Sequence, residues 1–183
     1  MDTQDHFRIV KLRELIRDVH DFPKPGIVFK DITPLLAHPA GLSLAVEYMT
    51  QPFRHMQVDL VAGAESRGFI FGTAIAQNLS AGFVPIRKPG KLPHHTHSEE
   101  YALEYGTDRV EVHRDAIEPG DKVLLVDDVL ATGGTMNACC RLVRAAGGNI
   151  VGVAVLLELA FLNGRNQLHE YPVHSILRYD SET

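Results

Sequence analysis

The chain has 183 residues, of which 45% are hydrophobic and 22% charged, and its formal net charge is −5. This length favours one domain of ordinary size, and the acidic excess argues against a nucleic-acid partner, which would call for a basic surface. The adjacent Cys139 and Cys140 have neither disulfide nor zinc-site spacing, so we expect a reduced protein. No apolar run reaches the roughly 18 residues of a membrane span, so we expect no membrane partner. The first residues lack the pattern of a secretory signal, and we therefore expect a cytoplasmic protein.

Two helices separated by a proline-rich loop are predicted near the N-terminus. Apolar residues recur at helical spacing from about Asp5 to His20, which predicts one amphipathic helix over that range. The segment Phe22-Pro23-Lys24-Pro25-Gly26 ends this helix, because two prolines and a glycine do not continue it. A second helix is expected from Gly41 to Met49.

From Val58 onward the chain alternates between strand and helix patterns. Strands are predicted at Val58–Gly63, Phe83–Ile86, Lys122–Asp127 and Ile150–Leu157, and helices at Gly68–Leu79 and Gly134–Ala146. This alternation indicates an α/β protein with a mainly parallel central sheet flanked by helices. The continuous apolar run before Asp127 is typical of a strand that is covered on both faces.

One segment interrupts the alternation. Tyr101–Tyr105 and Arg109–His113, joined by Gly106-Thr107-Asp108, predict an antiparallel hairpin. The preceding stretch from Lys88 to Glu100 is polar and rich in proline, glycine and histidine, so we expect a long loop. A loop of that length in a compact domain is usually functional.

The most specific motif is a buried strand that runs into two acids and then a glycine loop. Its residues are Asp127 and Asp128, followed by Ala131-Thr132-Gly133-Gly134-Thr135. Gly133 and Gly134 allow backbone N–H groups to close on an anion, and the start of a helix attracts a phosphate. Carboxylates accept hydrogen bonds from a sugar diol and can hold hydrated magnesium. The motif therefore predicts a ribose 5-phosphate site.

This motif resembles the signature of the type I phosphoribosyltransferases, which bind phosphoribosyl pyrophosphate (PRPP). Three further regions resemble the adenine phosphoribosyltransferases in particular: residues 22–36, residues 62–69, and residues 87–93 with 103–107. The resemblance covers about Phe22 to Gly164. It implies the type I phosphoribosyltransferase fold in a single domain over 1–183, with an N-terminal hood over about 1–36, a PRPP-binding core over about 37–183 and a flexible-loop hairpin.

The resemblance also implies a reaction. Adenine and PRPP would give AMP and pyrophosphate in purine salvage, with Mg²⁺ as cofactor bound mainly through PRPP and, by way of water, Asp127 and Asp128. A homodimer is implied as well. Adenine would lie under the hood between Phe29 and Leu159, while the Val28 carbonyl accepts from its 6-amino group and the Lys30 N–H donates to N1. A 6-oxopurine reverses both groups and would be rejected.

The remaining roles also follow from the resemblance. Ser66 and Arg67 would bind pyrophosphate in a loop that has a cis peptide bond before Ser66. Lys88 and Lys91 would bind it too, and so would Arg87, either in the same subunit or from the neighbouring one. Glu104 would accept the imidazole proton of adenine, and Tyr105 would help to close the loop. Lys30 stands where arginine is common in the family.

Two alternatives remain at this point. A phosphoribosyltransferase for another purine, such as xanthine, would share the PRPP loop. A PRPP-sensing regulator without catalysis would bind DNA, but only about 20 residues precede the hood segment that begins at Phe22, and the chain is acidic. His94, His95 and His97 form a cluster that we do not expect to bind a functional metal, because no cysteine completes a ligand set.

Overall fold

A computed structural model describes residues 3–102 and 106–182. Its centre is a five-stranded parallel sheet in the order β4-β3-β7-β8-β9. The strands are β3 (Leu60–Ala64), β4 (Gly82–Ile86), β7 (Lys122–Leu130), β8 (Asn149–Leu159) and β9 (Val173–Tyr179). The expected α/β architecture with a mainly parallel central sheet is confirmed.

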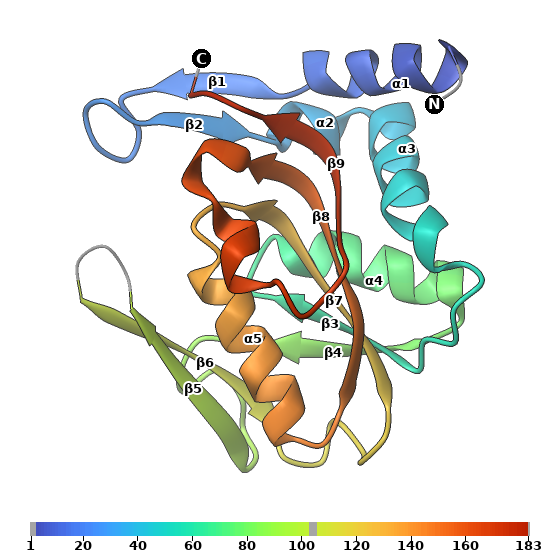
Figure 1. Ribbon diagram of the computed structural model, residues 1–183, viewed down its shortest axis with the longest axis vertical. Coiled ribbons are helices and arrows are strands. Elements are labelled where there is room, and N and C mark those ends of the chain that lie inside the picture. Colours follow the sequence, from blue (N-terminus) through green and yellow to red (C-terminus); the bar gives the residue numbers. More distant parts are fainter. Residues whose placement is uncertain (1–2, 103–105, 183) are drawn as a thin grey trace.

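Helices cover both faces of this sheet (Figure 1). The helix α5 (Gly134–Ala145) lies on one face, and α3 (Pro39–Thr50) and α4 (Gly68–Leu79) lie on the other. Two apolar cores result, because β7 alternates its side chains between them: Leu125 packs in the α5 core and Leu124 in the other. No helix in the described part of the chain is long and apolar enough to cross a membrane.

The strands and helices between Val58 and Leu157 were predicted nearly in place. The main difference is that β7 continues through both acids to Leu130 instead of ending at Asp127. Its pairing with β8 explains the extension, because the ladder persists as far as Leu130 and Glu158. The acid pair therefore lies on a rigid strand, at its exit from the sheet.

The prediction of a single N-terminal helix from about Asp5 to His20 is wrong. The helix α1 (Thr3–Glu14) ends early, and β1 (Arg17–His20) pairs antiparallel with β2 (Val28–Asp31). The pairing of Val19 with Phe29 across this ladder overrides the helical spacing of the apolar residues. A short helix, α2 (Thr33–Ala37), follows β2.

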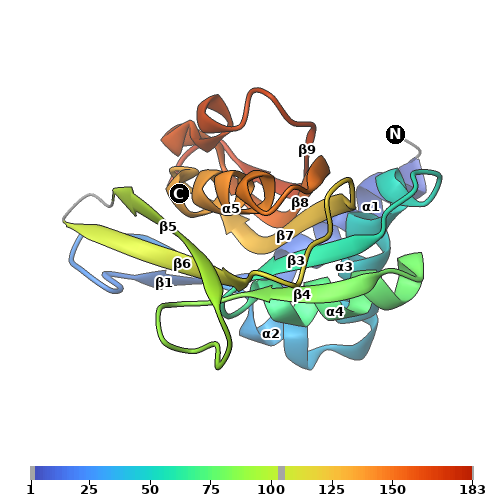
Figure 2. The same ribbon diagram turned by 90° about the horizontal axis from the view of Figure 1, so that it is seen from below.

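The hairpin is confirmed as antiparallel, but its boundaries differ. Its strands are β5 (Thr96–Ala102) and β6 (Thr107–His113), so the loop expected through Glu100 ends before Thr96, and Ala102 pairs with Thr107. Figure 2 shows the hairpin beside α5 and continuing from the β4 edge, to which the Arg87–Glu111 bridge joins it.

The described residues also form three short 3₁₀ segments: η1 (Gln51–Phe53), η2 (Ala160–Leu162) and η3 (Gly164–Gln167). None of these three segments was predicted, and neither was the edge strand β9. The sequence of β9 holds too few consecutive apolar residues to stand out, and most of it is only partly buried.

Candidate active site

A cavity of about 330 Å³ opens where β3 and β7 end. It is lined by Glu65, Ser66, Arg67, Lys88 and the continuous segment from Asp127 to Met136. Ligands of open parallel sheets bind at the carboxyl ends of the strands, and this cavity lies at that edge. The structure therefore brings the acid pair, the glycine loop and Ser66-Arg67 together, as the sequence predicted.

The glycine loop is built for close backbone approach. Gly133 has φ +86°, and a Cβ there would come within 2.5 Å of the Gly164 carbonyl oxygen. The helix α5 begins at Gly134, so its first N–H groups have no partner within the helix. A non-glycine residue at 133 would be strained and would displace Gly164, so the loop depends on this glycine.

The two acids differ in their surroundings. Asp128 is only 3% exposed, and its Oδ2 lies 2.9 Å from Arg67 Nε. Asp127 Oδ1 accepts from the Asp128 N–H at 2.9 Å. Burial raises the pKa of both carboxyls, the charge of Asp128 adds to the rise in the pKa of Asp127, and Arg67 opposes the rise at Asp128. Hydroxyl donors or a cation bound at this pair would therefore stabilise its charged carboxylates.

The loop before α4 brings Arg67 to this pair. The Glu65–Ser66 peptide bond is cis, as expected from the family resemblance. Gly68 lets α4 start against β7, because a Cβ there would lie 2.8 Å from the Val126 carbonyl oxygen. The Arg67 guanidinium also lies 5.2 Å from the centre of the Phe29 ring, so it joins the acid pair to the hood strand β2.

The proposed pyrophosphate cations occupy different places. Lys88 lines the cavity, and its Nζ contacts Asp108 and donates to the Tyr101 hydroxyl at 2.9 Å. Partial burial alone would raise the pKa of Asp108, but the hydrogen bonds led by Lys88 lower it. Arg87 and Lys91 are not among the residues that line the cavity; Arg87 Nη1 donates to the Lys91 carbonyl at 3.2 Å.

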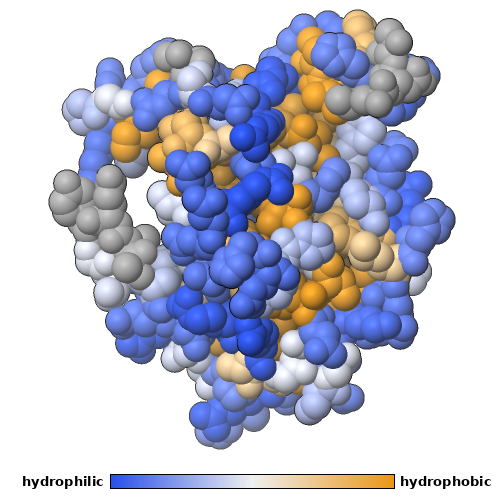
Figure 3. Space-filling model, in the orientation of Figure 1, coloured by the Kyte–Doolittle hydropathy of each residue, from blue (hydrophilic) through white to orange (hydrophobic). Residues whose placement is uncertain are grey.

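A second, more apolar cavity of about 730 Å³ adjoins the first, with which it shares Thr132 and Gly134. Val28 of β2 lines it from the hood, and Leu159 of β8 lines it from the core. The space-filling view shows the molecule hollowed between the hairpin and the rest of the chain (Figure 3). A cavity of this kind beside the first suits a planar base.

Lys30 is not among the residues that line either cavity. Its Nζ is 2.9 Å from Asp18 Oδ1 and donates to the Glu182 carbonyl at 3.1 Å, and its side chain is only 4% exposed. Lys30 therefore ties the hood strand to the residues that follow β9.

Glu104 and Tyr105, the expected proton acceptor and loop-closing residue, lie outside the described residues. Their roles stay predictions. Several residues that contact the site were missed because nothing in their local sequence marks them. They are Asp108 and Tyr101 beside Lys88, and Gly164 and Gln167 beside the glycine loop.

A family model, a sequence relative and a solved structure all relate the chain to the same kind of protein. The model of the phosphoribosyl transferase domain family matches residues 31–181. The adenine phosphoribosyltransferase of Rhodopirellula baltica is 54% identical over 176 residues, which are 96% of this chain and 85% of that protein. The crystal structure of adenine phosphoribosyltransferase from Rhodothermus marinus has a TM-score of 0.91 at 55% identity and covers 95% of this chain and 99% of its own.

A more distant structure carries ligands. Adenine phosphoribosyltransferase from Saccharomyces cerevisiae, complexed with adenine and an imino-altritol bisphosphate, has a TM-score of 0.89 at 35% identity and covers 94% of this chain and 99% of its own.

Proposed function

The chain belongs to the adenine phosphoribosyltransferases of the phosphoribosyl transferase domain family, and from this membership we propose how its residues serve the reaction. The enzyme transfers the phosphoribosyl group of PRPP to adenine, which gives AMP and pyrophosphate. The alternatives of a xanthine enzyme and a non-catalytic regulator are not favoured by its relatives. The division into a hood and a PRPP-binding core remains part of the proposal.

One observation carries the assignment of the sugar-phosphate site: the partly buried Asp127, the buried Asp128 and a glycine loop line one wall of a cavity. Asp127 and Asp128 would accept hydrogen bonds from the ribose hydroxyls. The loop from Ala131 to Thr135 would hold the 5-phosphate through backbone N–H groups and the threonine hydroxyls, at the start of α5. The Ser66-Arg67 wall opposite would receive the pyrophosphate.

The base would lie in the adjoining apolar cavity. The strand β2 pairs with β1 and with no other described strand, so one of its edges offers free N–H and C=O groups. The Val28 carbonyl and the Lys30 N–H would read the 6-amino group and N1 of adenine, with Phe29 and Leu159 on the two ring faces. An oxopurine would leave both backbone groups unpaired, which is costly in an apolar site.

The site residues fit Mg²⁺ held mainly by substrate. The described residues contain no cluster of three or more His, Cys, Asp or Glu that could hold a metal ion by themselves. Magnesium typically takes one or two carboxylates together with substrate phosphates and water. Asp127 and Asp128 supply two carboxylates whose burial calls for positive charge. Bound there, Mg²⁺ would neutralise charge on the departing pyrophosphate.

The chain's own cations would share that task. Arg67 and Lys88 line the cavity and can donate to pyrophosphate oxygens. Lys91 would join them when the loop closes. Arg87 does not line the cavity of its own chain, which favours a role in the active site of a second subunit in a cytoplasmic homodimer. Glu104 would take the proton that adenine loses on attack at ribose C1, and Tyr105 would close over PRPP.

The test supplies labelled adenine, hypoxanthine, guanine and xanthine separately with PRPP and Mg²⁺. Nucleotide is expected to form only with adenine. Product formed only from an oxopurine would contradict both the assigned base and the hood contacts.

A further inference from the structure

The segment that follows β8 folds back onto the glycine loop from outside the first cavity, and its Phe161, Leu162 and Gln167 line the second. It contains η2 and η3, and its Gly164 lies so close to Gly133 that neither position has room for a Cβ. Gln167, at the end of η3, donates from Nε2 to the Thr132 carbonyl oxygen at 3.0 Å. A residue without any expected role thus holds the backbone of the loop proposed to bind the 5-phosphate.

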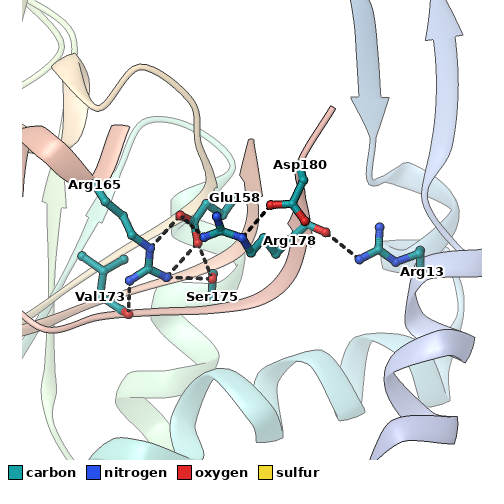
Figure 4. Close-up of polar contacts among 7 residues, drawn as sticks. All are labelled: Arg13, Glu158, Arg165, Val173, Ser175, Arg178 and Asp180. Atoms are coloured by element: carbon teal, nitrogen blue, oxygen red, sulfur yellow. Dashed lines mark hydrogen bonds and ion pairs between the residues drawn. The ribbon is translucent and has the colours of Figure 1, made fainter. Parts of the chain in front are cut away.

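An ion pair between a buried carboxylate and a partly exposed arginine anchors this segment (Figure 4). Glu158, the penultimate residue of β8, is 3% exposed, and both of its carboxylate oxygens accept from Arg165, at 2.6 and 2.7 Å. Arg165 also donates to the Val173 carbonyl at 2.8 Å, which ties it to β9. A two-point arginine–carboxylate pair fixes orientation as well as distance. Gln167 lies two residues after Arg165, so the ion pair also fixes the position of the backbone from which Gln167 reaches the loop.

The hydrogen bond acts on the peptide unit between Thr132 and Gly133. This unit is planar and is not among the cis bonds of the chain, so the Thr132 carbonyl and the Gly133 N–H point in opposite directions. A donor that fixes the carbonyl also fixes the direction of the N–H. Gly133 at positive φ has access to more backbone conformations than other residues, and the loop needs such an external restraint.

The amide of Gln167 is itself held in one orientation. Its Oε1 accepts from Asn137 Nδ2 at 3.3 Å, and Asn137 belongs to the first turns of α5. Gln167 consequently bridges the loop and the helix whose start faces the same cavity. We propose that Gln167 is a positioning residue for PRPP: it orients the Thr132–Gly133 peptide so that the Gly133 N–H is preset for the 5-phosphate. This inference rests on the proposed phosphate site.

The test replaces Gln167 by methionine, which has similar length but cannot donate. Gln167 is exposed, so the fold should be retained. The matched control is Asn166→Leu, which removes the adjacent exposed amide from the same 3₁₀ turn. The measurements are KM for PRPP and adenine, the dissociation constant of AMP, and the thermal midpoint.

For Gln167→Met we expect KM for PRPP and the AMP dissociation constant to rise about three- to tenfold, the loss of one well-placed hydrogen bond. Because Gln167 also lines the second cavity, KM for adenine should change, but by less than KM for PRPP. The thermal midpoint should stay at the wild-type value, and Asn166→Leu should change none of the four. Unchanged PRPP and AMP binding would overturn the inference, and so would an equal loss for adenine. Failure of the wild-type enzyme to convert adenine would instead refute the proposed function.

Discussion

Arg67 and Asp128 form an ion pair in the lining of the cavity proposed to bind PRPP, with 2.9 Å between Nε and Oδ2. Because Asp128 is buried, its carboxylate depends on this partner when no ligand is bound. The same guanidinium faces the ring of Phe29. One side chain therefore touches the proposed diol site and the hood, and it would have to serve pyrophosphate as well.

Replacing Arg67 by methionine is expected to lower kcat/KM for PRPP by about 10²-fold or more, because a cation is lost and Asp128 is left unpaired. Arg67 holds the pKa of Asp128 down against burial, so its loss should raise that pKa further. The acidic limb of the pH profile of kcat/KM should then move to higher pH. Arg67→Lys should restore part of the profile; an unshifted limb in Arg67→Met would contradict the coupling.

Glu104→Gln tests the proposed proton acceptor. An amide cannot take the imidazole proton of adenine, so we expect kcat to fall by about 10²–10⁴-fold. PRPP should still bind, as measured by calorimetry with Mg²⁺. Turnover at the wild-type rate would remove Glu104 from the mechanism.

The parts of the fold and site that could be predicted are encoded locally. The helix α4 and the strand–acid–glycine segment from Val123 to Thr135 carry their apolar runs, turns and ligand groups within a few consecutive residues. A local pattern is enough there, because the carboxyl end of a parallel strand places such a loop at the ligand edge.

The rest depends on contacts between residues far apart in sequence. Gln167 reaches Thr132 across 35 positions, and Lys30 reaches Glu182 across 152. The hood strand β1 exists because β2 pairs with it, although its own residues fit a helical spacing. A local pattern of residue types does not identify a partner that lies far away in the sequence. These long-range contacts were therefore missed, although the site residues that they hold in place were predicted.

Asp31 gives the stability of the hood a predictable pH dependence. The Thr33 backbone N–H, followed by Arg17, lowers the pKa of Asp31 from 3.8 to about 2. A lowered pKa in the folded state means that this contribution is full above about pH 4 and is lost as the pH falls towards 2. Asp31→Asn should thus lower the urea midpoint at pH 7, and the difference from wild type should shrink by pH 2.5. An equal difference at both values would contradict this origin.

Lys30→Met should loosen the hood over the base. The methionine cannot donate to Asp18 or to the Glu182 carbonyl, so β2 loses its tie to the residues after β9. We expect KM for adenine to rise about three- to tenfold, since Val28 and Phe29 directly precede this position, while KM for PRPP stays within about twofold. Lys30→Arg keeps the charge and serves as the control. A rise in the PRPP constant alone would contradict the assignment.

Asp108 is expected to act on PRPP through Lys88. An ammonium has three donors; Tyr101 and Asp108 engage two, and the third remains available in the cavity that Lys88 lines. Asp108→Asn should leave the ammonium less firmly placed, which raises KM for PRPP and the inhibition constant of pyrophosphate about three- to tenfold and leaves KM for adenine unchanged. The matched control is Glu100→Gln, which removes the exposed Glu100–Arg109 pair of the same hairpin. It should have little effect on PRPP binding, because such surface pairs contribute about 0–1 kcal/mol and Glu100 lines only the second cavity. If both variants weaken PRPP binding equally, the effect belongs to the hairpin as a whole, and Asp108 has no particular role in placing Lys88.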